Sequence, residues 1–155
     1  MKLKLMWPGK TRNNEIRRLQ EFYLKRINQL ETCILKETKA AKGIDEKFEK
    51  KIKDLEAKEL EKNLKDDYII CLCNDGKEMN SKEFAHFLEK TVLTSNRAIS
   101  FVLGGFMGLE ERILKQADFL LSLSQMTFSH ELCRVMLLEQ IYRSLTILRG
   151  KKYAK

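Results

Sequence analysis

The chain has 155 residues, of which 43% are hydrophobic and 34% are charged. This length suits one domain with a real core, so we expect residues 1–155 to form a single domain. No apolar run approaches the length needed to span a bilayer, which excludes a membrane-spanning protein. Lysines among the apolar residues of Met1–Pro8 disfavour a signal peptide, and we expect a cytoplasmic protein.

The net charge of +8 is distributed unevenly along the chain. Residues 36–66 mix lysine and glutamate, which is typical of a solvated helix face. By contrast, residues 134–155 contain a single acid, Glu139, and six basic residues, namely Arg134, Arg143, Arg149, Lys151, Lys152 and Lys155. A one-sided basic segment predicts an anionic partner such as nucleic acid.

The cysteines and histidines do not form a metal-binding pattern. The four cysteines are Cys33, Cys71, Cys73 and Cys133, and their spacing contains no pair of closely spaced pairs. The two histidines, His86 and His130, lie in unrelated contexts. We therefore predict reduced thiols that act as small hydrophobic side chains, and no metal.

Hydrophobic periodicity predicts alternating strands and helices in the first half of the chain. Lys2–Trp7 alternates polar and apolar residues like a half-buried strand, which Pro8 and Gly9 end. Capping oxygens in residues 11–14 begin a helix, and Glu31–Lys36 follows as a strand. A long helix then opens at Gly43–Asp45, with one apolar stripe formed by Phe48, Ile52, Leu55 and Leu64.

The second half continues the alternation. Tyr68–Cys73 is almost uninterruptedly apolar, as in a strand buried on both faces, and Asn74–Lys77 is typical of a turn. The elements expected after it are a helix capped at Asn80 and Ser81, a strand at Ile99–Leu103, a helix at Leu109–Gln116, a strand at Ala117–Ser122 and a helix at His130–Leu148. This order predicts an α/β fold with a mostly parallel open sheet and helices on both faces.

A pair of glycines, Gly104 and Gly105, follows the strand at Ile99–Leu103, and Gly108 comes shortly after. Glycine permits positive φ and lets a ligand approach the backbone closely, and ligands of open α/β sheets bind beyond the strand ends. The alternative is a tight turn that binds no ligand. The chain has neither a GxGxxG motif after its first strand nor a phosphate loop ending in GK[ST], which disfavours dinucleotide and nucleoside triphosphate chemistry.

Hydroxyl side chains cluster after the strand at Ala117–Ser122, at Ser122, Ser124 and Thr127. They are suited to the polar ends of an adenosyl ligand, with Leu123, Met126 and Phe128 flanking its base. The alternative is a serine-rich cap for the last helix, and His130 at that helix start is more typical of a structural histidine. No Ser-His-Asp, Cys-His or paired-carboxylate arrangement is evident, which leaves no candidate for covalent or hydrolytic catalysis.

At these residues the chain resembles the RlmH (YbeA-like) family of SPOUT-class methyltransferases, which modify a pseudouridine in 23S ribosomal RNA. The segments that carry the resemblance are Leu103–Gly105 with Gly108, Leu121–Ser124, Met126–Phe128, His130, Arg134 with Val135, Leu138–Arg143, Ile147–Gly150 and Tyr153. Met1–Leu3, Gly9, Lys10, Gly76 and Lys77 also agree. The resemblance is end to end, strong from 101 to 153 and loose in the charged middle.

The resemblance implies a C-terminal trefoil knot, S-adenosylmethionine as cofactor, an obligate homodimer, and methylation at N3 of a pseudouridine in helix 69 of 23S rRNA on the ribosome. The cofactor contacts that it implies are Leu72, Gly104, Gly105, Leu123, Ser124, Gln125, Met126, Thr127 and Phe128. The catalytic residues that it implies are Arg134 and Tyr153, and the RNA contacts are Arg134, Arg143, Lys151 and Lys152.

The chain departs from the family pattern at three places. Ser129 stands where the family usually has proline, Ala154 stands where it has histidine, and Phe106 and Met107 follow the double glycine. The loss of the histidine leaves open a non-catalytic RNA-binding or ribosome-associated protein that keeps the fold. A nucleotide-binding regulatory module without RNA is a third reading, against which the basic C-terminal segment counts.

Overall fold

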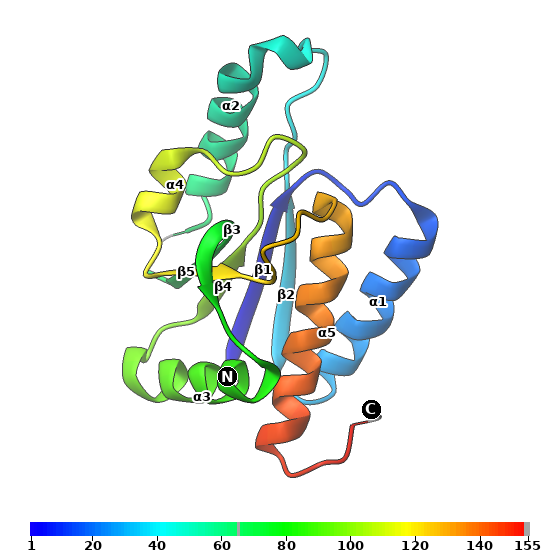
Figure 1. Cartoon of the computed structure of the whole chain (residues 1–155), viewed down its shortest axis with the longest axis vertical. Coiled ribbons are helices and arrows are strands. Elements are labelled where there is room, and N and C mark those ends of the chain that lie inside the picture. The colour runs from blue at the N-terminus through cyan, green and yellow to red at the C-terminus, as the bar shows by residue number, and fades with distance from the viewer. Residues whose placement is uncertain (65, 154–155) are drawn as a thin grey trace.

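The computed structural model describes residues 1–64 and 66–153. Its strands are β1 (Lys2–Pro8), β2 (Thr32–Thr38), β3 (Tyr68–Glu78), β4 (Ile99–Val102) and β5 (Phe119–Ser122). Its helices are α1 (Asn14–Asn28), the 3-10 turn η1 (Glu46–Phe48), α2 (Glu49–Glu61), α3 (Ser81–Ser95), α4 (Glu111–Gln116) and α5 (His130–Leu148). The strands form one parallel sheet in the order β2-β1-β4-β3-β5 (Figure 1).

Helices cover both faces of this sheet, because strand residues alternate between two buried clusters. Leu3, Leu5 and Trp7 of β1 pack with residues of α1, α3 and α5 on one face. Met6, between them in the strand, packs with Ala57 and other residues of α2 and α4 on the opposite face. The predicted α/β architecture is confirmed, whereas strand order alone does not decide the trefoil knot, which stays a prediction.

Polar caps fix where the long helices begin. The side chain of Asn13 accepts a hydrogen bond from the backbone of Ile16 at the start of α1. Asn80 begins α3 with a reciprocal capping box, in which Glu83 bonds back to the Asn80 backbone. The side chain of Ser129 caps α5, so the cap of α5 is the residue next to His130 rather than one of the earlier hydroxyls.

The turn predicted at Asn74–Lys77 is wrong, because β3 continues through these residues to Glu78. The pairing of β3 with β5 shifts register between Leu72 and Lys77, and both residues pair with Leu121. The strand bends sharply there (Figure 1). A β-carbon on Gly76 would lie 2.4 Å from the backbone carbon of Leu121, so glycine permits the irregular pairing.

The apolar stripe predicted for the long helix is also wrong in part. Phe48 and Leu55 are 51% and 38% exposed, whereas Ala57, Leu60 and Leu64 are buried. The helix contacts β1, β2 and α4, and the residues it buries lie in its C-terminal half. The helix therefore buries Ala57 and Leu60, whereas periodicity predicted burial of Phe48 and Leu55.

None of the helices in residues 1–64 and 66–153 is long and apolar enough to cross a membrane.

Candidate functional site

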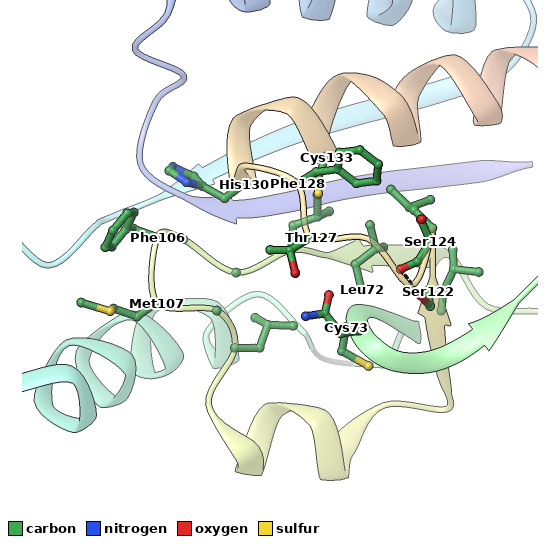
Figure 2. Close-up of a pocket in the computed structure, with 18 of the residues that line it drawn as sticks. Leu72, Cys73, Phe106, Met107, Ser122, Ser124, Thr127, Phe128, His130 and Cys133 are labelled. Carbon is green, nitrogen blue, oxygen red and sulfur yellow. Dashed lines mark hydrogen bonds between the residues drawn. The ribbon is translucent and has the colours of Figure 1, made fainter.

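A cavity of 320 Å³ lies at the carboxyl ends of β4 and β5, beside Leu72–Asn74 at the bend of β3 and the start of α5 (Figure 2). Parallel strands bring these ends to one edge of the sheet, where ligands of open α/β folds bind. The residues that line it are Leu72, Cys73, Asn74, Leu103, Gly104, Gly105, Phe106, Met107, Gly108, Leu109, Leu121, Ser122, Leu123, Ser124, Met126, Thr127, Phe128, His130 and Cys133. Apolar side chains, hydroxyls and glycine backbone thus meet in one place.

One wall of this cavity is the glycine loop, the segment Leu103–Leu109 that follows β4. This loop folds back on itself. Gly105 and Gly108 form an isolated bridge, and the Gly108 N–H donates to the Gly105 carbonyl at 3.0 Å. A β-carbon on Gly104 would lie 2.4 Å from the carbonyl carbon of Gly108, and Gly108 has φ +81°. The loop geometry therefore requires glycine at Gly104 and Gly108. The tight turn is confirmed, and contact of this loop with a ligand stays a prediction.

The opposite wall is the loop from β5 to α5. The Ser122 hydroxyl donates to the Ser124 carbonyl at 3.0 Å, and the Ser124 hydroxyl accepts from the Met126 N–H at 3.0 Å. These bonds hold the loop open around the cavity, and Thr127 points its hydroxyl toward the interior in Figure 2. Met126 also lines the cavity and is 72% exposed.

Four cysteines are free, and two of them, Cys73 and Cys133, are half-buried in the cavity wall. Burial raises the pKa of both thiols, and it raises that of Cys33 and of Cys71 to about 12. The thiols are therefore protonated at neutral pH and act as small apolar groups, as predicted. No cluster of metal-ligating side chains occurs within the described residues.

A second cavity, of 680 Å³, adjoins the first. It lies between the segments that follow β1 and β2, the glycine loop and the start of α5, and it shares Gly105, Phe106, Met107 and His130 with the first cavity. The acidic, lysine and arginine residues that line it are Lys10, Arg12, Glu37, Lys39, Lys42, Glu46, Glu56, Glu131 and Arg134. Sequence reasoning did not predict it, because its walls come from four separate segments.

Arg134 is not on the surface but is 1% exposed. Its guanidinium donates to the Thr11 hydroxyl at 3.0 Å and the Pro8 carbonyl at 2.9 Å, and it lies 4.9 Å from the ring centroid of Trp7. Burial lowers its pKa to about 10, so it stays charged at neutral pH. Arg134 thus ties α5 to the end of β1 while it also lines the second cavity, and its expected roles in catalysis and RNA binding stay predictions.

The other residues expected to act on RNA lie at the far end of α5 from the first cavity. Arg143 pairs with Glu139 at 2.7 Å and stacks 4.4 Å from the ring centroid of Tyr153. The Tyr153 ring packs edge-on against Tyr142, and burial together with the contact to Tyr23 raises the pKa of its hydroxyl. Lys151 and Lys152 are exposed beside it. Ala154 lies outside the described residues.

Most of the cofactor contacts expected from the sequence line the first cavity. Of the nine residues expected to contact a cofactor, all but Gln125 line it. The sequence did not assign Cys73 or Cys133 to the cavity, nor His130, which was expected to be structural. The sequence did indicate that His130 lies near the cavity, since it closely follows the loop at Ser122–Phe128. Its position between two cavities, however, depends on the tertiary fold.

The chain matches the family described as "Predicted SPOUT methyltransferase" over residues 1–154. It is 40% identical over 152 residues to ribosomal RNA large subunit methyltransferase H from Thermodesulfovibrio yellowstonii, covering 98% of this chain and 97% of that protein. It is 38% identical to the Clostridium botulinum protein of the same name, with both chains covered completely.

Solved structures share the fold at low sequence identity. A probable methylase family protein from Haemophilus influenzae superposes with a TM-score of 0.56 and 14% identity, covering 99% of this chain and 70% of that one. A putative methyltransferase from Legionella pneumophila, solved with its bound cofactor SAM, gives a TM-score of 0.50 and 11% identity, covering 91% of this chain and 65% of that one.

Proposed function

Because the chain belongs to the SPOUT methyltransferase family, we propose that it is an S-adenosylmethionine-dependent methyltransferase of large-subunit ribosomal RNA. Its target is N3 of a pseudouridine in helix 69 of 23S rRNA, methylated on the ribosome, which implies a cytoplasmic location. The full-length similarity to ribosomal RNA large subunit methyltransferase H supports the activity and the RNA class. The base and the helix rest on the family resemblance.

The observation that carries the cofactor assignment is the composition of the first cavity. Its volume of 320 Å³ falls within the range of about 300–1,000 Å³ that is usual for small-ligand sites. Leu72, Leu123 and Phe128 offer apolar surface to an adenine ring, while Ser124 and Thr127 offer hydroxyls to polar groups. The residues present therefore fit S-adenosylmethionine.

The bound cofactor supplies an electrophilic methyl group for attack by a ring nitrogen. The protein's own part is then to hold the two reactants in line and to exclude water, which contributes through proximity and orientation. The glycine loop and the Ser122–Phe128 loop provide fixed walls on two sides of the cavity. No covalent intermediate with the protein is needed.

We also propose a homodimer in which the tail of one chain completes the site of the other. Tyr153 follows the C-terminal end of α5, whereas the first cavity lies at the start of this helix. Nineteen helical residues span about 28 Å, so Tyr153 does not reach the cavity of its own chain. A partner related by two-fold symmetry is the source that places a tail there.

A surface suited to that partner runs along α1 and α5, which pack side by side. Leu19 and Phe22 of α1 are 47% and 46% exposed. A groove of 560 Å³ adjoins them, lined by residues of α1, α3 and α5 including Leu19, Phe84 and Met136. Exposed apolar side chains beside a groove favour an isologous contact between two copies.

The decisive experiment is mass spectrometry of helix 69 nucleosides after incubation of the protein with S-adenosylmethionine and ribosomes that lack this methyl group. We expect N3-methylpseudouridine to form only when protein and cofactor are both present. The chain truncated after Gly150 is the matched control, since it lacks the tail and keeps the cavity. Methylation at another nucleotide would overturn the target, and no methylation would overturn the activity.

The second candidate is a ribosome-binding protein that keeps the fold without turnover. Ala154 motivates it, because the family has a histidine at this position near the substrate. It predicts binding of both S-adenosylmethionine and ribosomes with no methyl transfer in the same experiment. The variant Ala154→His distinguishes two causes of inactivity. If the missing histidine is the cause, this variant regains methylation of helix 69; if the protein has a different target, it does not.

A further inference from the structure

The wall between the two cavities is formed by the glycine loop and the first residue of α5. Phe106 and His130 belong to both cavities, and their rings lie edge to face with centroids 6.3 Å apart. Figure 2 shows the two rings together at one end of the first cavity. A group at this boundary can therefore contact ligands in both cavities.

The His130 imidazole is available for proton transfer. No described residue hydrogen-bonds its ring, and neither ring nitrogen is fully buried. Burial lowers its pKa; Arg134 on α5 and Arg12 on the β1–α1 segment lower it further, while Glu131 opposes them. A neutral imidazole with a free nitrogen is a proton acceptor at neutral pH.

The second cavity has the chemistry to receive a nucleotide. Lys10, Arg12, Lys39 and Lys42 stand exposed at its edge, and none of the four forms an ion pair within residues 1–64 and 66–153. Phe106 is 70% exposed beside them and offers a flat ring for stacking. Exposed cations next to an exposed aromatic ring are the combination that binds a phosphate and its base.

We propose that the second cavity receives the target nucleotide and that His130 is the catalytic base that takes the proton from its ring N3. This inference rests on the proposed methyltransferase function and assigns it a substrate pocket and a proton acceptor. The base stacks on Phe106, and its phosphate lies among the four edge cations. Its N3 then lies beside His130, at the boundary where the two cavities share their lining residues.

The proton and electron balance is complete without a further reactant. The N3–H proton moves to an imidazole nitrogen of His130, which becomes imidazolium. The N3 electron pair forms the new bond to the methyl carbon, and the carbon–sulfur pair remains on sulfur, giving the neutral thioether product. His130 afterwards releases its proton to solvent through the open second cavity.

Glu37, Glu46, Glu56 and Glu131 also line this cavity, and Glu56, which lies against the glycine loop, is a poorer candidate than His130. Glu56 is 7% exposed, and its Oε2 atom is fully buried behind Gly105. Burial raises the pKa of its carboxyl, and no hydrogen-bond partner reaches Oε2. His130 has the accessible atom that a proton transfer needs, whereas Glu56 does not.

The first test compares His130→Gln with the matched control His86→Gln. These are the two histidines of the chain, and His86 lies on an exposed face of α3 with 73% of its side chain accessible. At saturating cofactor and ribosomes, His130→Gln should slow single turnover at pH 7 by about 100-fold or more, as loss of a general base does. His86→Gln should keep the wild-type rate and the wild-type cofactor affinity, whereas His130 lines the cofactor cavity, so calorimetry of His130→Gln sets the cofactor concentration that saturates it.

The pH dependence distinguishes a base from a structural residue. The wild-type rate should rise with pH as His130 loses its proton and reach a plateau, with a midpoint below the ordinary histidine value, because the pKa of His130 is lowered. His130→Gln should lack this step. A folded His130→Gln protein that keeps the rate, or keeps the same step, would overturn the assignment.

The second test does not depend on activity. In the cofactor-free protein, nitrogen-detected resonances of the two imidazoles are followed while pseudouridine 5′-monophosphate is added to millimolar concentration. The His130 resonance should shift and that of His86 should not. The N3-methylated nucleotide, which has no N3–H to donate, should leave the His130 nitrogen unshifted; equal shifts with both nucleotides, or with neither, would refute the contact.

The two proposals fail in different ways. If wild-type protein methylates helix 69 but His130→Gln does so equally well, the function stands and the role of His130 falls. If wild-type protein does not methylate ribosomes at all, the function falls, while the nucleotide titration still decides whether the second cavity binds the pseudouridine ring against His130.

Discussion

The carboxyl group of Glu56 rests against Gly105, on the side of the glycine loop that faces away from the first cavity. A β-carbon at Gly105 would lie 2.9 Å from Oε2 of Glu56. Gly105 is buried, and its backbone is not in the left-handed region. Glycine therefore lets the Glu56 carboxylate pack against the loop, and a β-carbon at Gly105 would force that carboxylate to shift.

Gly105→Val should abolish S-adenosylmethionine binding, because the added side chain displaces either Glu56 or the loop that lines the cavity. Gly105→Ala should lower the free energy of unfolding by about 1–3 kcal/mol, the usual cost of overpacking. Calorimetry with cofactor and urea unfolding measure the two effects. Unchanged affinity in a folded Gly105→Val protein would contradict the cofactor site.

Double variants distinguish the steric constraint at Gly105 from the one at Gly104. Glu56→Ala should recover most of the stability lost in Gly105→Ala, since it removes the atom that the β-carbon meets. It should not rescue Gly104→Ala, whose β-carbon meets the backbone of Gly108 at 2.4 Å. Equal rescue of both variants would show that the Glu56 contact does not set the requirement at Gly105.

The stability of the fold should respond to the titration of Glu56. Because burial raises its folded-state pKa above the unfolded value, its stabilising contribution is present at low pH and is lost as pH rises through the folded-state pKa. Glu56→Gln removes this loss. Its stability relative to wild type should therefore increase from pH 4 to pH 8 in urea unfolding, and a constant difference would contradict the raised pKa.

Arg134→Ala should act first on stability. Its guanidinium makes two buried hydrogen bonds, and hydrogen bonds from charged groups are each worth about 1.5–3 kcal/mol, so we expect a loss of about 3–6 kcal/mol in urea unfolding. Arg143→Ala, which breaks a partly exposed pair with Glu139, should cost less than about 1 kcal/mol. An Arg134→Ala protein of wild-type stability that lacks turnover would support the direct catalytic role expected from the sequence.

The tail should act in trans. The chain truncated after Gly150 should bind S-adenosylmethionine normally and fail to methylate, and sedimentation should show a dimer for both forms. Mixing it with Gly105→Val chains should restore about a quarter of the wild-type activity, because half of the dimers are mixed and each has one complete site. No recovery in verified mixed dimers, or a full rate in the truncated protein alone, would refute the shared site.

Lys151 and Lys152 should contribute salt-dependent binding to ribosomes. Both are exposed, and replacing both with alanine should weaken binding and flatten the slope of log affinity against log salt by about one unit per lysine. Cofactor affinity should not change, because both residues lie at the far end of α5 from the cavity. An unchanged salt slope would remove them from the RNA surface.

The first cavity was largely predictable because it is built from contiguous loops. Gly104 and Gly105 follow one buried strand and Leu123–Phe128 follow another, and parallel topology brings strand ends to one edge. Hydrophobic periodicity predicted the wrong buried residues in α2, because the tertiary fold decides which part of a helix packs against the sheet. Phe48 and Leu55 have the spacing of a buried stripe, yet the helix uses Ala57 and Leu60 because its N-terminal half extends past the sheet.

By itself the sequence determined the α/β class, the family, the bounds of α5 and two of the loops that line the first cavity, since these depend on local periodicity, capping and short motifs. Tertiary structure decided the burial of Arg134 against Trp7, the continuation of β3 through Gly76, and the meeting of two cavities at His130. The physical reason is that charge, exposure and proton affinity are set by neighbours distant in the chain. Thr11 and Glu56 are such neighbours of Arg134 and Gly105, and no local pattern in the sequence names them.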